Sequence, residues 1–180
     1  MANGPVRLAK AALVAAIAIG VTSQAGIGGT GGAAPGDGHP TLQGDGLGGL
    51  QFGTTERVAT RELTAQLGAP TSHPAAGCVG GYSDVAWHDL IAQFKHGRFS
   101  GYRYWVTRPH QSITPKLATA RGITLGSTFG QLRRLYVLTQ TATDFWSAAG
   151  MTFGLNSATY PSPPSAPIYE VKVNACPAAL

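Results

Sequence analysis

Apolar residues recur at helical spacing after residue 55. Ala59, Leu63 and Leu67 stand four residues apart, which predicts a helix over 56–67 with one buried face. Gly68 follows directly, and glycine is the residue that most often ends a helix. The pattern therefore predicts a short amphipathic helix with a defined end.

A similar phrase precedes this helix and a second one. Residues 50–55 read Leu-Gln-Phe-Gly-Thr-Thr, and residues 123–128 read Ile-Thr-Leu-Gly-Ser-Thr. Each phrase predicts a short strand, a glycine hinge and a hydroxyl pair that can cap a helix. The second helix is expected to begin at Phe129, with its apolar stripe continued by Leu132, Leu135 and Tyr136.

Alternating apolar and polar positions predict the strands. A hairpin turn is expected at residues 95–98, where Gly97 can adopt a positive φ. The strands are expected within 85–94 before this turn, over 99–106 after it, and over 146–155 and 168–173. The resulting order is strand, helix, hairpin, strand, helix and two strands.

This order predicts an α+β domain. Two related strand–helix units, at about 47–106 and 121–180, are expected to pack on one shared antiparallel sheet, with one disulfide. The 180-residue length suits one domain or two small units that share a core.

The N-terminal residues have the features of an export signal. Arg7 and Lys10 precede an unbroken apolar run over 11–20, and Ser23-Gln24-Ala25 offers a cleavage site. We expect residues 1–25 to be a signal peptide, with an uncleaved anchor as the alternative. Residues 26–46 are rich in glycine and are expected to form a flexible linker to the domain at 47–180.

Charge and composition narrow the class of partner. Only 12% of residues are charged, against about 25% in average soluble domains. Without Arg7 and Lys10, the 13 basic residues fall to 11 against 8 acidic ones, a net charge of +3. We expect a secreted or envelope-associated protein that contacts the membrane only through its signal, and no nucleic-acid partner.

Cys78 and Cys176 are the only cysteines in the chain. An oxidising compartment favours a disulfide between them, with one possible intramolecular connectivity. The alternative, a catalytic thiol at Cys78 near His73, fits such a compartment poorly.

Motifs for catalysis and metal binding are absent from the sequence. There is no G-x-S-x-G nucleophile motif, no H-E-x-x-H and no repeated C-x-x-C. His88 and Asp89 are adjacent, but neighbouring strand residues point to opposite faces. We expect no enzyme, no catalytic residue, no cofactor and no metal; an envelope hydrolase with an unrecognised site is the alternative.

The predicted hairpin is the strongest candidate for a binding surface. Aromatic and basic residues, which are common anchors at protein interfaces, alternate along its return strand. The candidate contacts are Arg98, Tyr102, Arg103, Tyr104 and Trp105. Tyr102 and Tyr104 share one face and Arg103 and Trp105 the other, and the pattern leaves open which face is buried.

The duplicated phrase also carries a family resemblance. Phe52-Gly53-Thr54-Thr55, with a helix that ends Leu67-Gly68-Ala69-Pro70, resembles the tandem modules of beta-lactamase inhibitory protein and small outer-membrane-assembly lipoproteins. The layout of Asp45–Gly48, Trp87–Leu90, Gly97–Tyr102 and Gly122–Gly126 is more similar to a group of secreted actinobacterial proteins with no assigned function.

The resemblance spans about 45–176 and implies a binding role without catalytic residues. It departs from the inhibitory protein in its cysteines, since that protein has a disulfide in each repeat. The expected function is therefore an exported binding protein that engages an unknown protein or an anionic envelope polymer through its sheet face or hairpin. A structural envelope protein without a soluble ligand is a further alternative.

Overall fold

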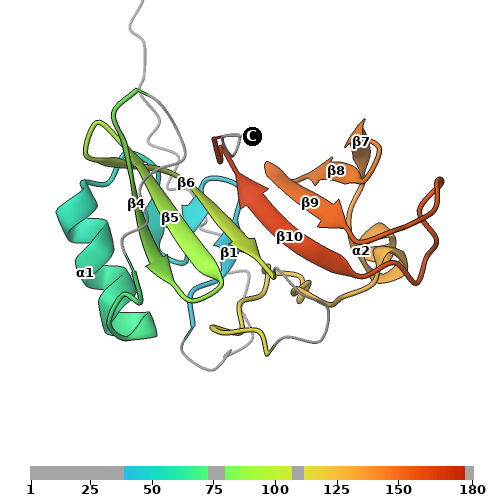
Figure 1. Ribbon diagram of the computed structural model, residues 1–180, viewed down its shortest axis with the longest axis horizontal. Coiled ribbons are helices and arrows are strands. Elements are labelled where there is room, and N and C mark those ends of the chain that lie inside the picture. Colours follow the sequence, from blue (N-terminus) through green and yellow to red (C-terminus); the bar gives the residue numbers. More distant parts are fainter. Residues whose placement is uncertain (1–38, 73–79, 107–111, 177–180) are drawn as a thin grey trace, which may run out of the picture. The chain divides into compact units, whose positions relative to one another are not determined.

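A computed structural model of the chain describes residues 39–72, 80–106 and 112–176, which all belong to the unit Ala33–Leu180. A seven-stranded antiparallel sheet forms its centre, in the order β4-β5-β6-β10-β9-β8-β7 (Figure 1). Its strands are β4 (Tyr82–Trp87), β5 (Leu90–Lys95), β6 (Arg98–Trp105), β7 (Thr139–Ala142), β8 (Phe145–Ala148), β9 (Met151–Leu155) and β10 (Ile168–Val173). The predicted signal, and the predicted linker up to residue 38, lie outside the described residues.

A second, small sheet lies at the start of the described chain. It consists of β1 (Leu42–Gln43), β2 (Gly46–Leu47) and β3 (Leu50–Gln51), paired in that order and antiparallel. Leu42 and Leu47 are buried in the core. Because β1 falls within the stretch 26–46, the ordered structure begins earlier than the linker prediction placed it.

Two helices complete the fold. Helix α1 spans Glu56–Leu67 and buries Ala59 and Leu63, as its apolar spacing predicts. Helix α2 spans Phe129–Leu135 and buries Phe129 and Leu132. The helix starts and the end of α1 are confirmed.

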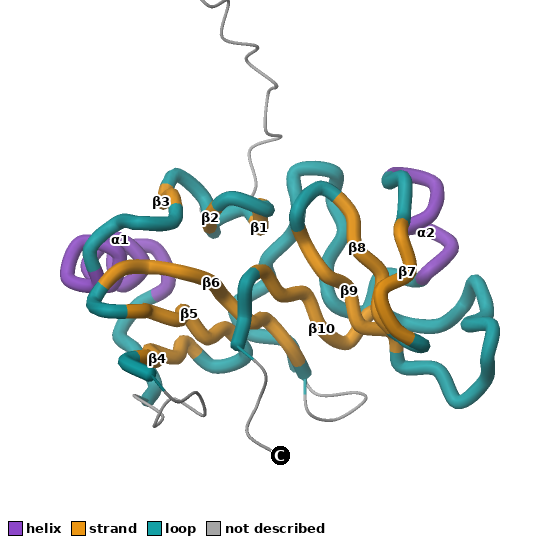
Figure 2. The backbone as a smooth tube through the Cα atoms, turned by 90° about the horizontal axis from the view of Figure 1, so that it is seen from above, coloured by secondary structure: helices purple, strands orange, loops and turns teal. Residues whose placement is uncertain are grey.

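The helices and the small sheet lie on the same side of the large sheet (Figure 2). The Trp87 indole on β4 donates to the carbonyl of Gly68 after α1, at 3.0 Å. The Tyr102 hydroxyl on β6 donates to the Gln43 carbonyl of β1, at 2.9 Å. Trp146 on β8 packs against Phe129 of α2, with ring centroids 5.0 Å apart. One face of the large sheet is therefore covered. No described helix or strand packs on the other face, which we name the open face.

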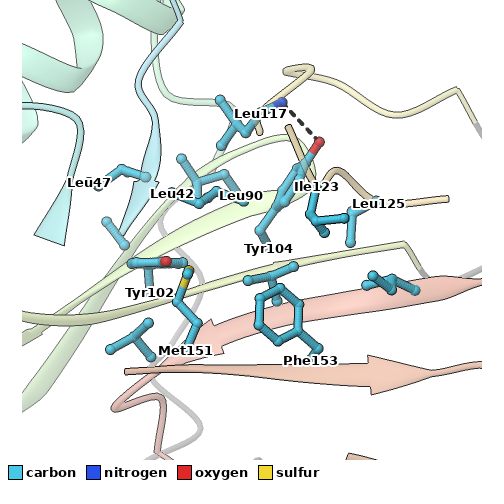
Figure 3. Packing of buried hydrophobic residues seen from close by; sticks show 14 of the residues in the cluster. Leu42, Leu47, Leu90, Tyr102, Tyr104, Leu117, Ile123, Leu125, Met151 and Phe153 are labelled. Carbon is cyan, nitrogen blue, oxygen red and sulfur yellow. Dashed lines mark hydrogen bonds between the residues drawn. The ribbon is translucent and has the colours of Figure 1, made fainter. Parts of the chain in front are cut away.

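The two central strands supply the middle of the core. Tyr104 of β6 is fully buried, and its hydroxyl donates to the Pro115 carbonyl and accepts from the Leu117 amide (Figure 3). Burial raises the pKa of Tyr104 to about 12, so the phenol stays protonated and can keep donating. Phe153 of β9 and Val171 of β10 pack on the same face.

The duplicated phrase makes the same backbone contacts in both places. The Gly53 amide donates to the Phe99 carbonyl, and the Phe99 amide donates back to Thr54. Gly126, Ser127 and Ile168 repeat this exchange of hydrogen bonds. Phe99 lies at the start of β6 and Ile168 at the start of β10, so each phrase anchors one central strand.

The predicted fold class is wrong, because it expected each of these phrases to supply a strand to one shared sheet. Leu50–Gln51 pairs within the small sheet, and Thr124 makes an isolated bridge to Ala118. Neither phrase contributes a strand to the large sheet, so the α+β arrangement of two strand–helix units on one shared sheet is not present. Strands dominate instead, with only two helices in the part of the chain that the structure describes.

Further differences concern the second half of the chain. The strand expected over 146–155 is two strands, because Ala149 and Gly150 adopt positive φ and form a turn. The sequence does not predict strand β7, since Thr139–Ala142 has no apolar alternation and all four residues are exposed.

In the first half of the chain, the hairpin turn predicted at residues 95–98 is confirmed, with His96 and Gly97 both at positive φ.

The two edges of the large sheet differ. At β4, the Thr71 amide donates to the Ala86 carbonyl, and the Ala86 amide donates to Ser72. At β7, no described backbone segment pairs with the outer side of the strand. The β4 edge is therefore paired at Ala86, whereas the β7 edge is open among the described residues.

The predicted disulfide has no described geometry. Cys78 lies outside the described residues, so no disulfide lies wholly within them. Cys176 is in the disulfide-bonded form, and its amide donates to Oε1 of Gln93 on β5, at 3.0 Å.

Candidate functional site

The open face carries a group of charged and aromatic side chains over its central strands. Register places Lys172 of β10 beside Arg103 of β6, and Glu170 beside Trp105. Strands β9 and β8 continue the same face with Gly154 and Phe145. We name Arg103, Trp105, Phe145, Tyr169, Glu170 and Lys172 the open-face cluster.

Glu170 is the centre of this cluster. Its side chain is 1% exposed, although a carboxylate is rarely buried unless it is paired. Arg103 Nε donates to its Oε1, and Lys172 Nζ lies 3.5 Å from its Oε2. Two cations therefore share one buried carboxylate, which leaves a local charge of +1.

Each cation also lies over an aromatic ring. The Arg103 guanidinium is 4.5 Å from the centroid of Trp105, and Lys172 Nζ is 4.3 Å from that of Phe145. Both cation side chains remain about one third exposed, at 31% and 32%. The ion pairs and the rings together hold the cations in defined positions at the surface.

Tyr169 extends the aromatic part of the cluster. Its ring centroid lies 6.4 Å from that of Phe145, and a register irregularity between Ile168 and Glu170 brings it there. Gly154 lies beneath both rings, where an added Cβ would come within 3.0 Å of each. Burial, with the nearby Glu170 charge, raises the pKa of Tyr169, so its hydroxyl is a hydrogen-bond donor at neutral pH.

A second polar group lies on the open face over β4 and β5. Asp84 is opposite Gln93 and is buried, with Oδ1 lacking a hydrogen-bond partner among the described residues. Burial raises the pKa of Asp84, and a hydrogen bond from Gln93 opposes the shift.

The structure separates the five predicted contact residues. Arg103 and Trp105 belong to the open-face cluster. Tyr102 and Tyr104 are fully buried, so neither can touch a partner. Arg98 is exposed, but its guanidinium donates to the Gly53 carbonyl at 2.9 Å and so supports the turn before α1. The face of β6 that carries Tyr102 and Tyr104 is therefore the buried one.

The other members of the cluster come from strands that the sequence argument did not treat as a surface. Phe145 lies on β8, and Glu170 and Lys172 lie on β10. The alternation over 168–173 does place Glu170 and Lys172 on one face, which was the available signal. Pairing of β10 with β6 is a long-range contact that local spacing does not specify.

The His88–Asp89 pair forms a turn between β4 and β5 rather than part of a strand. His88 has a positive φ, and Asp89 Oδ2 accepts from the Thr114 amide at 2.9 Å. The described residues contain no group of three or more histidine, cysteine or acidic side chains that could hold a metal ion. Asp89 thus has a structural contact.

Comparisons with protein-family models, with curated proteins and with solved structures find no match. A separate search of the described helices finds none with the length and apolar character needed to span a membrane.

Proposed function

We propose that this is an exported binding protein that recognises a partner protein through the open-face cluster. One observation carries the proposal: two cations, each over an aromatic ring, share the buried carboxylate of Glu170. Arginine and aromatic side chains that are already positioned lose little conformational entropy on binding, and they are common at the centres of interfaces. The resemblance to inhibitory and assembly modules agrees with such a role.

The partner surface is expected to be acidic at the point of contact. The cluster has a local charge of +1, and the chain without its signal has a net charge of +3. An acidic protein surface would therefore be attracted to this face. An anionic envelope polymer is also negatively charged, although it would make fewer contacts with the aromatic rings.

The test is capture from envelope extracts with Trp105→Ala, compared with Tyr160→Ala as the control. Tyr160 is an exposed aromatic residue outside the cluster, so its truncation removes a similar ring from another surface. The expected result is loss of a specific protein with Trp105→Ala and its retention with Tyr160→Ala. Equal capture by both variants would reject the open-face cluster as the binding surface.

A second arm separates the two kinds of partner. Poly(acrylic acid) serves as an anionic polymer without peptide bonds, with binding measured at low salt and at about 0.5 M NaCl. If the probe polymer binds the wild-type chain and the Trp105→Ala variant equally well, the result favours a polymer as the partner. Protease treatment of the extract that abolishes capture supports a protein.

A further inference from the structure

A cavity lies on the covered side of the large sheet, between α2 and the proline-rich loop before β10. Its volume is about 610 Å³, within the range of small-molecule sites. Phe129 and Tyr136 border it from the α2 region, Trp146 from β8, and Pro161–Pro164 from the loop. Because the cavity contacts the opposite face of the sheet, it is separate from the open-face cluster.

Two polar side chains that line this cavity each have a buried atom without a partner. Four buried side-chain polar atoms in the described residues have no hydrogen bond. Two of them, Trp146 Nε1 and Ser162 Oγ, belong to residues that line this cavity. An unpaired buried donor is costly, and native structures usually satisfy it. An indole nitrogen can only donate, and neither atom is exposed to solvent, so a ligand acceptor reaches them only when the side chains shift.

The Arg133 side chain, a cation without a carboxylate partner among the described residues, lines the same cavity. It is exposed and lies 5.6 Å from the centroid of the Phe129 ring. None of the described acidic side chains forms an ion pair with Arg133, whereas Arg61 and Arg103 each have one. A guanidinium of this kind matches a carboxylate.

We propose that this cavity binds a carboxylate carried on an apolar or aromatic body. The rings of Phe129, Tyr136 and Trp146 and the prolines would contact the apolar part, while Arg133 would bind the carboxylate. A small shift of the Trp146 and Ser162 side chains would bring Nε1 and Oγ to acceptor oxygens of the ligand. A free organic acid and the C-terminal end of a peptide share this chemistry.

The test uses isothermal titration calorimetry on the folded chain with four probes. The probes are 3-phenylpropionate, its neutral amide, N-acetyl-Gly-Phe and the C-terminal amide of that dipeptide. We expect saturable binding of at least one acid, at least about tenfold tighter than its amide. The stronger of the two acids identifies the free-acid or the peptide source.

Arg133→Gln and Arg134→Gln are the matched pair of variants. They remove the same charge from adjacent helix positions, but Arg134 does not line the cavity. Arg133→Gln should abolish the preference for the acid, and Arg134→Gln should keep it. Equal loss in both variants, or no preference for the acid in the wild-type chain, would overturn the proposal.

Trp146→Phe and Ser162→Ala report on the unpaired polar atoms. Each should weaken acid binding by about threefold to tenfold, while Ser162→Ala leaves unfolding free energy unchanged or higher because an unpaired hydroxyl is removed. If Trp146→Phe does not fold, Ser162→Ala and Arg133→Gln still decide the matter. No saturation by any probe up to about 5 mM, weaker than the 1 mM scale, would mean that the cavity holds water only.

Discussion

The two halves of the large sheet are anchored by the same kind of turn, but they differ at their outer edges and in the space beside their helices. In the first, α1 buries Ala59 and Leu63, and residues 71–72 pair with the outer edge at Ala86. In the second, the shorter α2 and strands β7–β10 leave a cavity and an open edge. The same anchoring turn thus supports one half with a paired outer edge and one half with a cavity and an edge that no described segment pairs with.

The largest expected effects concern the buried leucines of the two helices. Leu63 of α1 and Leu132 of α2 are both fully buried. Leu63→Ala should lower the unfolding free energy by about 3–5 kcal/mol, and Leu132→Ala by about 2–3 kcal/mol, because the side chains around α2 have room to collapse. Urea unfolding measures both. A larger loss for Leu132→Ala would show that the second half is packed as tightly as the first.

The anchoring turns should respond alike. Gly53 and Gly126 have φ of 92° and 84°, and an added Cβ would meet no atom within 4 Å at either position. Gly53→Ala and Gly126→Ala should therefore each cost only the conformational strain, about 1–2 kcal/mol. Thermal unfolding of both variants checks this. A clear difference between the two would mean that the turns are not energetically equivalent.

Removing the N-cap side chain should cost more stability in the second half than in the first. Thr128 accepts from the Gln131 amide, and Gln131 reciprocates in a capping box, whereas the Thr55 side chain makes no capping bond. Thr128→Ala should cost about 1 kcal/mol and Thr55→Ala close to none. Urea unfolding of the pair provides the measurement, and equal losses would contradict the assigned cap.

The smallest expected effect depends on pH and belongs to the first half. Since burial raises the pKa of Asp84, the folded chain keeps its proton at pH values where the unfolded chain has lost it. Ionisation therefore lowers stability as pH rises above about 3.9, the usual aspartate pKa, through the raised folded value.

Asp84→Asn should thus stabilise the fold at pH 7, by a few tenths to about 1 kcal/mol. The gain should shrink toward pH 4, where the wild-type side chain is largely protonated in the folded state and about half protonated in the unfolded state. Urea unfolding at the two pH values tests this. A gain that is unchanged between pH 7 and pH 4 would show that ionisation of Asp84 is not its cause.

The sequence predicts local elements well where one face is clearly buried. The bounds of α1, the start of α2 and the turn at 95–98 follow from apolar spacing, a capping hydroxyl and Gly97. The strand predicted at 50–51 is present as β3 but pairs in the small sheet, and residues 123–125 form no named strand, because an apolar pair beside a glycine also suits a buried loop. Ile123 and Leu125 are core residues without belonging to a strand of the large sheet.

The sites depended on information that local patterns do not contain. The open-face cluster forms because β10 pairs with β6, and the sequence gives no register for that pairing. The cavity depends on how the loop at 157–167 folds back over α2, where Gly130 accommodates the Pro164 carbonyl. Tyr102 and Arg103 illustrate the limit, since alternation separated their faces without saying which one was buried.

The uncovered strand β7 also bears on self-association. An unpaired edge offers its amides and carbonyls to any extended chain, including another copy of this protein at high concentration. Two features of β7 oppose such stacking: it is only four residues long, and its register is irregular between Gln140 and Ala142. The Gln140 side chain also donates to the carbonyls of Ala142 and Thr143. A longer, regular strand at this position would favour growth of the sheet from molecule to molecule.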